Sequence, residues 1–350
     1  MDLTAYRALG RSGLIVSPLA LGTMTFGTPG WGASREDCAA IFDAYVEAGG
    51  NLIDTAEVYA GGASEEIVGE LTAARGLRDR LVLSTKFGWN ADPGAPNSGG
   101  AGRKNIRRAV EGSLRRLRTD YIDLYWLHFW DMVTPLEETL DTLVDLVRSG
   151  LIRHYALSDV PAWYATRLAT LAHALGWPGP VALQLEYSLV ERTAEQEHLP
   201  AGRECGFGLM PWSPLAGGFL TGKYSRDAKP EAGRLSGANP FGGSKFNDRN
   251  WAILDEVTAV AADLGVSPAQ VALAWVAGRP GVDSTLIGAS RPEQLRDNLA
   301  ALAVELDADT QARLDKASQP ERGFPYSGYT PQIQSTIFGG RTVSGWLDRR

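Results

Sequence analysis

NLIDTAEVYAGGASEEIVGE, residues 51–70, begins with three residues suited to a buried strand and then places Asp54 and Tyr59 five positions apart. The apolar run at its start recurs along the chain, each time bounded by turn signals. The eight runs span residues 18–23, 51–55, 80–86, 121–128, 152–158, 180–187, 207–213 and 283–290. They predict eight strands.

Stretches with helical periodicity lie between most of these runs, for example at 35–49, 105–119, 136–150 and 161–176. Runs that are apolar on both faces, each followed by a crossover helix, indicate a parallel sheet covered by helices. Eight such units match a (β/α)8 TIM barrel better than an open sheet, and the chain lacks the G-x-G-x-x-G fingerprint of nucleotide-binding open sheets. The segment YRALGRSGLIVSP, residues 6–18, predicts a short N-terminal β-hairpin at the bottom of the barrel.

The composition fits one large globular domain, which we expect to span residues 1–350. Within it we expect a long cofactor-covering loop after the seventh strand, at 213–247, and a C-terminal loop or tail at 319–350. The absence of a membrane-length apolar run and of a signal-like N-terminus, together with only two cysteines, favours a cytoplasmic location. A net charge of −7 argues against nucleic-acid or membrane partners, and four scattered histidines argue against a metal site.

Four titratable side chains of different types follow three successive predicted strands. Asp54 ends the second strand, Tyr59 lies in the loop after it, Lys86 ends the third strand and His128 ends the fourth. In barrels of this type the chemistry takes place at the C-terminal ends of the strands. Each residue alone has an ordinary structural explanation, such as a turn cap for Asp54 or a core imidazole for His128. Their matching positions favour a catalytic set.

This set suits the reduction of a carbonyl group. Hydride addition converts the carbonyl oxygen to an alkoxide, so an acid must stand within hydrogen-bond reach. We expect Tyr59 to be that acid, with its pKa lowered by the Lys86 ammonium, Asp54 to hold Lys86, and His128 to be a second donor to the oxygen. Positioned acid catalysis of this kind accelerates a reaction by about 10²–10⁴.

Beyond these residues, the chain resembles the aldo-keto reductase superfamily over nearly its full length. The sequences of its motifs resemble those of bacterial members and potassium-channel beta subunits more than those of the mammalian aldose reductases. The motifs that carry the resemblance, in order, are LALGTMTFG, IDTAEVYAGGASEEIVGE, STKFG, YIDLYWLHFWD, QLEYSLV, PWSPLAGGFLTGKY and IGASRPEQLRDN. The catalytic tetrad of the family corresponds to Asp54, Tyr59, Lys86 and His128, with Tyr59 as proton donor. The resemblance therefore implies an NADP-dependent aldo-keto reductase of the alcohol dehydrogenase or carbonyl reductase type.

The resemblance also implies NADPH or NADP+ bound across the barrel mouth. Ser158 and Gln184 would bond the nicotinamide carboxamide, Trp212 would stack on its ring, and Thr23 and Met24 would line the ribose. Trp212 as an ordinary core residue is the alternative. The remaining residues that the resemblance places near the cofactor are Asp54, Asp159, Ser213, Pro214, Leu215, Gly217, Lys223, Arg234, Gly288, Ser290, Arg291, Gln294 and Asn298.

The two ends of the cofactor have separate motifs. GGFLTGKY, residues 217–224, imitates a P-loop, but Tyr224 replaces the Ser or Thr that would bind magnesium, which excludes a nucleoside triphosphatase. Lys223 would instead contact the pyrophosphate. Ser290, Arg291 and Gln294 at a helix N-terminus would bind the 2′-phosphate and favour NADP over NAD, although a simple capped helix is the alternative.

One departure from the family and one group of aromatics bear on specificity. Asp159 stands where many members have asparagine, and an ionised carboxylate cannot donate a hydrogen bond. Aromatic walls for a substrate are expected from Phe26, Trp31, Trp89, Phe129 and Trp130. The main expectation is reduction of aldehydes or ketones to alcohols. The alternatives are a specialised keto-sugar or polycyclic ketone reductase and a redox-sensing regulatory subunit, while the oligomeric state is not predicted.

Overall fold

The computed structural model describes residues 1–226, 234–235 and 245–344. The chain divides into two compact units, Met1–Ser318 and Gln319–Arg350. Within the described residues the strands all lie in the first unit: β1 (Arg7–Ala8), β2 (Ile15–Val16), β3 (Leu19–Gly22), β4 (Leu52–Asp54), β5 (Val82–Phe87), β6 (Ile122–Leu127), β7 (Ile152–Ser158), β8 (Ala182–Glu186), β9 (Gly208–Trp212) and β10 (Thr285–Ile287).

Strands β3 to β10 form one parallel eight-stranded sheet in the order β10-β3-β4-β5-β6-β7-β8-β9. A parallel bridge between Leu209 and Val282 links its two ends, so the sheet closes almost completely into a barrel. Each of the eight barrel strands overlaps one of the eight predicted runs, with bounds that differ by at most three residues. The predicted (β/α)8 barrel is therefore confirmed.

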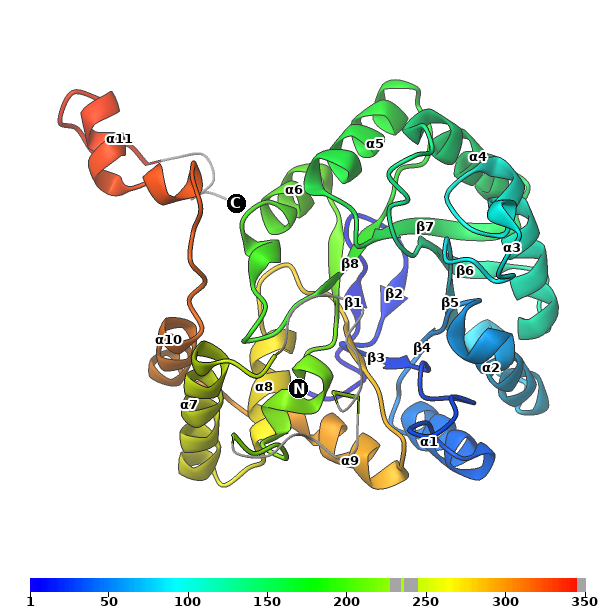
Figure 1. Ribbon diagram of the computed structural model, residues 1–350, viewed down its shortest axis with the longest axis horizontal. Coiled ribbons are helices and arrows are strands. Elements are labelled where there is room, and N and C mark those ends of the chain that lie inside the picture. The colour runs from blue at the N-terminus through cyan, green and yellow to red at the C-terminus, as the bar shows by residue number, and fades with distance from the viewer. Residues whose placement is uncertain (227–233, 236–244, 345–350) are drawn as a thin grey trace. The chain divides into compact units, whose positions relative to one another are not determined.

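Helices surround the strands of the first unit (Figure 1). Their bounds are α1 (Arg35–Glu47), α2 (Ala63–Ala74), α3 (Arg103–Leu117), α4 (Leu136–Arg148), α5 (Ala162–Ala174), α6 (His198–Cys205), α7 (Asp248–Leu264), α8 (Pro268–Ala277), α9 (Pro292–Ala300) and α10 (Ala308–Ala317). Capping residues fix where some of these helices begin. The Ser34 side chain accepts a hydrogen bond from Asp37 N at the N-terminus of α1, and Ser267 and Gln270 form a capping box at the N-terminus of α8. The second unit contains the short helix α11 (Pro331–Ile337).

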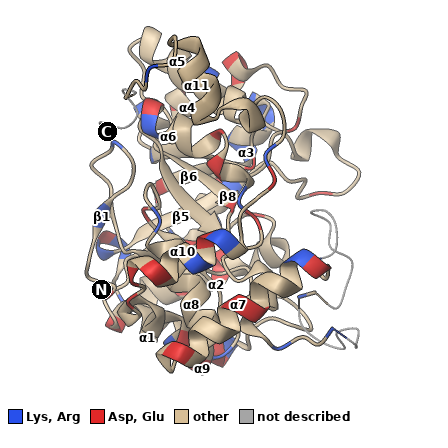
Figure 2. Ribbon diagram, turned by 90° about the vertical axis from the view of Figure 1, so that its left-hand side faces the viewer, with Lys and Arg blue, Asp and Glu red and all other residues tan. Residues whose placement is uncertain are grey.

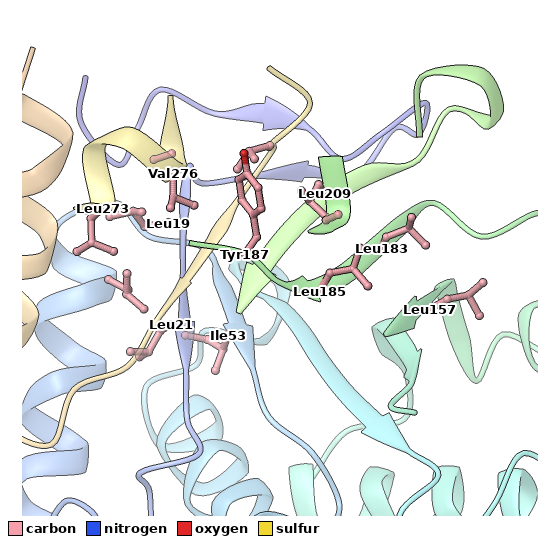
Figure 3. Close-up of a cluster of buried hydrophobic side chains, with 14 of the residues drawn as sticks. Leu19, Leu21, Ile53, Leu157, Leu183, Leu185, Tyr187, Leu209, Leu273 and Val276 are labelled. Carbon is pink, nitrogen blue, oxygen red and sulfur yellow. The ribbon is translucent and has the colours of Figure 1, made fainter. Parts of the chain in front are cut away.

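Alternating side chains divide the apolar core into an inner and an outer cluster. The inner cluster fills the barrel and includes Leu52, Val82, Leu124, Ala156 and Met210. The outer cluster lies between the strands and the helices. Figure 3 shows some of its members, among them Leu19 and Leu21 from β3 and Leu273 and Val276 from α8. Because successive side chains of a strand point to opposite faces, one strand contributes to both clusters.

Strands β1 and β2 pair antiparallel and form the predicted N-terminal hairpin. The hairpin contacts residues that precede the barrel strands: Gly10 N donates to Asp283 Oδ2 at 2.7 Å, and Arg11 N donates to Gly206 O at 2.8 Å. Leu9 and Val16 belong to the inner cluster and are fully buried. The hairpin therefore closes the end of the barrel opposite the C-terminal ends of the strands.

The remaining sequence expectations concern loops and surface. The predicted cofactor-covering loop at 213–247 lies partly outside the described residues, which here are 213–226, 234–235 and 245–247. Figure 2 shows acidic and basic residues interspersed on the helices of the face turned to the viewer. Within the described ranges no single helix has the length and apolar content of a membrane span; α7 and α8, bent by 99° at their junction, meet that test only as a pair.

Gly10 offers a test of how the hairpin is seated. Its φ is +54°, and a Cβ there would lie 2.3 Å from Val181 O and 2.6 Å from Gly206 O. We expect Gly10→Ala to lower the free energy of unfolding by roughly 2–4 kcal/mol, measured by urea denaturation, because backbone atoms have to move. Gly13→Ala is the control in the same hairpin, since its Cβ would meet nothing within 4 Å. Equal stability of the two variants would show that the hairpin is not tightly seated.

Candidate active site

The alternation of the strands determines which side chains reach the mouth of the barrel. Leu52, Val82 and Leu124 face inward, so steps of two and four residues also turn Asp54, Lys86 and His128 inward. The same steps from Ala156, Ala182 and Met210 turn inward a second group, consisting of Ser158, Gln184 and Trp212. Since the strands are parallel, these side chains gather at one end of the barrel.

Lys86 is the centre of the first group. Its side chain is 0% exposed, and its ammonium forms an ion pair with Asp54 Oδ2. It also donates to Thr55 O at 2.8 Å and contacts the Tyr59 hydroxyl at 3.3 Å. All three N–H donors of the ammonium therefore have an acceptor. Burial alone would lower the pKa of Lys86, but the Asp54 carboxylate and the Tyr59 hydroxyl outweigh it and raise the pKa above its ordinary value.

Tyr59 starts the short 3₁₀ turn Tyr59–Gly62, in which Ala60 and Gly61 have positive φ angles of 51° and 64°. This turn brings the phenol back over Lys86. Burial raises the pKa of Tyr59, and the opposing effect of Lys86 only partly offsets it. The expectation of a lowered pKa was thus right about the contribution of Lys86 and wrong about the net direction. Tyr59 remains protonated at neutral pH and retains a proton to donate.

His128 directly follows β6 and lies beside Tyr59. The two rings meet edge to face, with centroids 5.7 Å apart and an interplanar angle of 80°. Burial, with a smaller contribution from Lys86, lowers the pKa of His128 well below its ordinary value. A neutral imidazole has one donor and one acceptor nitrogen. The structure therefore brings all four predicted residues together, with a phenol and a neutral imidazole on the exposed side of a buried ion pair.

Above these residues lies a cavity of about 750 Å³. Most residues that the sequence placed near a cofactor or a substrate line it: Met24, Asp54, Tyr59, His128, Ser158, Asp159, Gln184, Trp212, Ser213, Pro214, Leu215, Gly217, Lys223, Arg234, Gly288, Ser290, Gln294 and Asn298, with Trp31, Trp89 and Phe129 among the expected aromatic walls. The cavity joins the catalytic end of the barrel to the start of α9.

Four expected binding residues lie elsewhere. Thr23 is buried, and its hydroxyl lies 3.1 Å from Asp54 O and 2.9 Å from Ser64 Oγ. Phe26 is fully buried in the outer cluster, so it forms core rather than a substrate wall. Trp130 packs edge to face on Trp163, with ring centroids 5.4 Å apart. Arg291 occupies the N-cap position of α9 and is exposed beside the cavity lining.

Other lining residues were not anticipated, among them Gly22, Thr25, Val58, Gly218, Thr221, Ser267, Ala269, Leu273, Leu286, Ile287, Ala289 and Asp297. Gly218 and Asp297 are chain neighbours of expected residues, which is a signal that could have found them. Ser267 is the N-cap residue of α8 and Leu273 lies in the middle of this helix, and only tertiary packing brings the helix to the cavity. No local pattern in the sequence predicts that α8 lies next to the cavity.

The end of the cavity away from the tetrad has features suited to phosphate. Gly217 and Gly218 have φ angles of 68° and 90°, and a Cβ at Gly218 would lie 2.9 Å from Lys223 Nζ. Glycine at this point leaves room for the Lys223 ammonium. At the start of α9, Gln294 Oε1 accepts from Ser290 N at 2.9 Å and from Ser290 Oγ at 3.0 Å, which fixes the turn. Over the described ranges, no group of three or more His, Cys, Asp or Glu side chains could hold a metal ion.

Comparison with known proteins agrees with this geometry. A family profile described as "Aldo/keto reductase family" matches residues 18–319. A "Probable voltage-gated potassium channel subunit beta" from Oryza sativa subsp. japonica is 38% identical over 85% of this chain and 91% of its own length. "Norsolorinic acid reductase stcV" from Emericella nidulans is 35% identical, over 90% of this chain and 81% of its own.

A third relative, "Aryl-alcohol dehydrogenase GME11368" from Pestalotiopsis microspora, is 32% identical over 93% of this chain and 85% of its own. All three matches extend over most of the barrel, and the profile begins at the first residue of the first predicted run. On its sequence, its barrel and these matches, the chain belongs to the aldo/keto reductase family.

Proposed function

We propose that this protein is an NADPH-dependent oxidoreductase that reduces aldehyde or ketone carbonyls to alcohols, with Tyr59 as the proton donor. The observation that carries the proposal is the contact chain from Asp54 through the Lys86 ammonium to the Tyr59 hydroxyl, 3.3 Å from Lys86 Nζ, beside a cavity of about 750 Å³. Family membership supports the general oxidoreductase role. NADPH, the proton donor and the substrate class are parts of the proposal.

The four residues divide the work of carbonyl reduction. Tyr59 keeps its proton at neutral pH and presents it to the cavity, while Lys86 stabilises the phenolate that forms when the proton leaves. Asp54 keeps Lys86 charged and in place. A neutral His128 orients the carbonyl oxygen by donating a second hydrogen bond without competing as a cation. A reduced nicotinamide cofactor, when bound, supplies the hydride that side chains cannot provide.

The cavity fits such a cofactor at both ends. Gln184 Nε2 donates to Asp54 Oδ1 at 3.3 Å, which leaves the amide oxygen of Gln184 to accept from a carboxamide. Ser158 and the half-buried Trp212 line the same end and would hold the ring. Lys223 and Arg234 also line the cavity and provide positive charge for phosphates, and Arg234 is near enough to Tyr59 and Glu186 to interact with both electrostatically. Ser290, Arg291 and Gln294 would bind the 2′-phosphate.

The substrate side of the cavity favours an apolar, aromatic carbonyl compound. Trp89 lies edge to face with His128, at a centroid distance of 6.1 Å, and also contacts Phe129 at 5.5 Å. Trp31 lines the cavity as well, so aromatic surfaces border the imidazole that would orient the carbonyl. One relative is named for an aryl alcohol, which supports this substrate class.

A second candidate function is a regulatory subunit that binds the cofactor and senses its redox state. The relative named as a potassium channel subunit favours it. The two functions differ in turnover. A panel of aromatic and aliphatic carbonyls, followed by the loss of NADPH absorbance, tests the first function; cofactor binding without turnover of any carbonyl would favour the second.

Asp159 is a carboxyl group in the cavity lining that ionises at an unusually high pH. Its φ is 48°, a conformation that Asp and Asn tolerate better than most residues, and its Oδ1 accepts from Trp212 Nε1 at 3.1 Å. Burial, reinforced by the nearby Glu186, raises the pKa of Asp159 to about 7. Asp159 therefore gains its negative charge near neutral pH rather than near pH 4.

The first prediction from this proposed function tests Tyr59 as proton donor. We expect Tyr59→Phe to lower kcat for carbonyl reduction by roughly 10²–10⁴, because the proton source is lost while the ring remains. Affinity for NADPH, measured by fluorescence titration, should stay within about threefold, since Tyr59 is not among the residues proposed to hold the cofactor. Tyr6→Phe, whose hydroxyl donates to Gly49 O far from the tetrad, is the control. Full activity of Tyr59→Phe would refute the assignment.

The second prediction concerns the 2′-phosphate. We expect Arg291→Ala to weaken NADPH binding by roughly 10–100-fold and NADH binding by less than about threefold, since a charged hydrogen bond is lost with NADPH alone. Isothermal titration with both cofactors measures the difference. Arg296→Ala on the same helix is the control because Arg296 is exposed and pairs with Glu293. Equal losses for NADPH and NADH would place Arg291 outside the phosphate site.

The third prediction concerns stability and pH. Between pH 4 and about 7 the folded protein keeps a proton on Asp159 that the unfolded chain releases, so stability falls as pH rises through this window. Asp159→Asn removes this cost while retaining an acceptor for Trp212. We expect the variant to exceed the wild type by roughly 1–3 kcal/mol at pH 8, with the gain shrinking toward pH 4. Urea denaturation at several pH values without cofactor measures it, and a gain independent of pH would contradict it.

A further inference from the structure

Two residues that the sequence did not single out lie directly beneath the ion pair. Ser84 belongs to β5 and Trp126 to β6, and both side chains point into the barrel. Ser84 is 1% exposed and Trp126 is fully buried. Most of the inner cluster around them is aliphatic, including Leu52, Val82 and Leu124. Two polar groups in such surroundings require partners of their own.

The partners form a chain that ends on the catalytic carboxylate. Trp126 Nε1 donates to Ser84 Oγ at 2.6 Å, and Ser84 Oγ donates to Asp54 Oδ1 at 2.7 Å. An indole N–H can only donate and an ionised carboxylate can only accept. The hydroxyl of Ser84 must therefore receive the indole hydrogen and direct its own hydrogen to Asp54. Both neighbours fix the direction of this hydrogen bond.

We propose that Ser84, with its hydroxyl oriented by Trp126, is a positioning residue that holds the Asp54 carboxylate in the geometry that Lys86 and Tyr59 need. This inference rests on the proposed carbonyl reductase function and extends it to a layer below the tetrad. Ser84 does not contact the cavity and acts only through Asp54.

The two oxygens of Asp54 show why this support matters. Oδ2 receives Lys86, while Oδ1 receives Ser84 at 2.7 Å and Gln184 at the longer distance of 3.3 Å. Without Ser84, Gln184 would be the remaining described side-chain donor to Oδ1. Its hydrogen bond of 3.3 Å is long, so the carboxylate would be held less firmly. Ser84 thus supplies the shorter of the two hydrogen bonds to Oδ1 that keep the carboxylate from rotating.

Removal of the Ser84 hydroxyl should also change the titration of the catalytic pair. Asp54 raises the pKa of Lys86 against burial. A carboxylate that is less well held supports the ammonium less strongly, so the coupled Lys86–Tyr59 pair should lose its proton at lower pH. A residue with a purely structural role would lower stability without moving this titration.

The test compares Ser84→Ala with Ser284→Ala. Ser284 is a matched control, because it is also buried and its hydroxyl has no hydrogen-bond partner among the residues that the structure describes. For Ser84→Ala we expect kcat to fall by roughly 10–100-fold, the alkaline limb of the kcat–pH profile to move to lower pH, and NADPH affinity to change by less than about fivefold. Ser284→Ala should change none of the three.

Two further measurements keep the inference testable. Trp126→Phe removes the indole N–H but keeps an aromatic ring, and it should shift the alkaline limb in the same direction by a smaller amount; it replaces Ser84→Ala if that variant does not fold. A crystal structure of Ser84→Ala should show a rotated Asp54 carboxylate and a Lys86–Tyr59 separation longer than 3.3 Å, a readout that needs no turnover.

The outcomes separate this inference from the function on which it rests. A wild type that turns over carbonyls, together with Ser84→Ala showing the same kcat, pH profile and Asp54 geometry, would overturn the role of Ser84 alone. Equal losses of kcat and stability in Ser84→Ala and Ser284→Ala, with no pH shift, would also overturn it. A wild type that reduces no carbonyl would overturn both the function and the inference.

Discussion

A fully buried lysine ammonium is the constraint around which the mouth of this barrel is arranged. Removing such an ion from water costs several kcal/mol, so Lys86 requires an acceptor for each of its N–H groups. Asp54 and Thr55 come from the end of β4, and Tyr59 comes from the turn after it. The register that pairs Asp54 with Ser84 of β5 places these acceptors around the ammonium. The strand register and the proposed chemistry thus both depend on acceptors for the buried ammonium of Lys86.

Much of the fold and of the site could be predicted from the sequence, because both depend on alternation along strands. The eight apolar runs predict the barrel strands, and Asp54, Lys86 and His128 follow strand ends that parallel pairing brings together. Interactions that depend on tertiary packing were missed. Phe26 is core because of how its loop folds back, and Ser84 and Trp126 meet only through the pairing of β5 and β6. The net pKa shift of Tyr59 depends on burial, which no local pattern reports.

Charge is distributed unevenly along the cavity. At the tetrad the ammonium of Lys86 is neutralised by Asp54 and buried, and His128 is held neutral. Arg234 interacts electrostatically with Tyr59 and Glu186, and Lys223 lines the cavity beside Gly218, which has a positive φ angle. The tetrad therefore lies beside aromatic side chains, and Lys223 and Arg234 supply positive charge to the cavity. This positive charge is compatible with the anionic groups of the cofactor proposed above.

The N-terminal hairpin has a further consequence for how ligands come and go. Leu9 and Val16 fill the interior at the end of the barrel opposite the tetrad. The tetrad is therefore accessible to solvent only from the C-terminal ends of the strands. Two molecules that share a single entrance cannot pass each other inside it. The one that binds deeper has to arrive first and depart last, so the closed base of the barrel imposes an ordered sequence of association and release on any two-substrate reaction carried out above it.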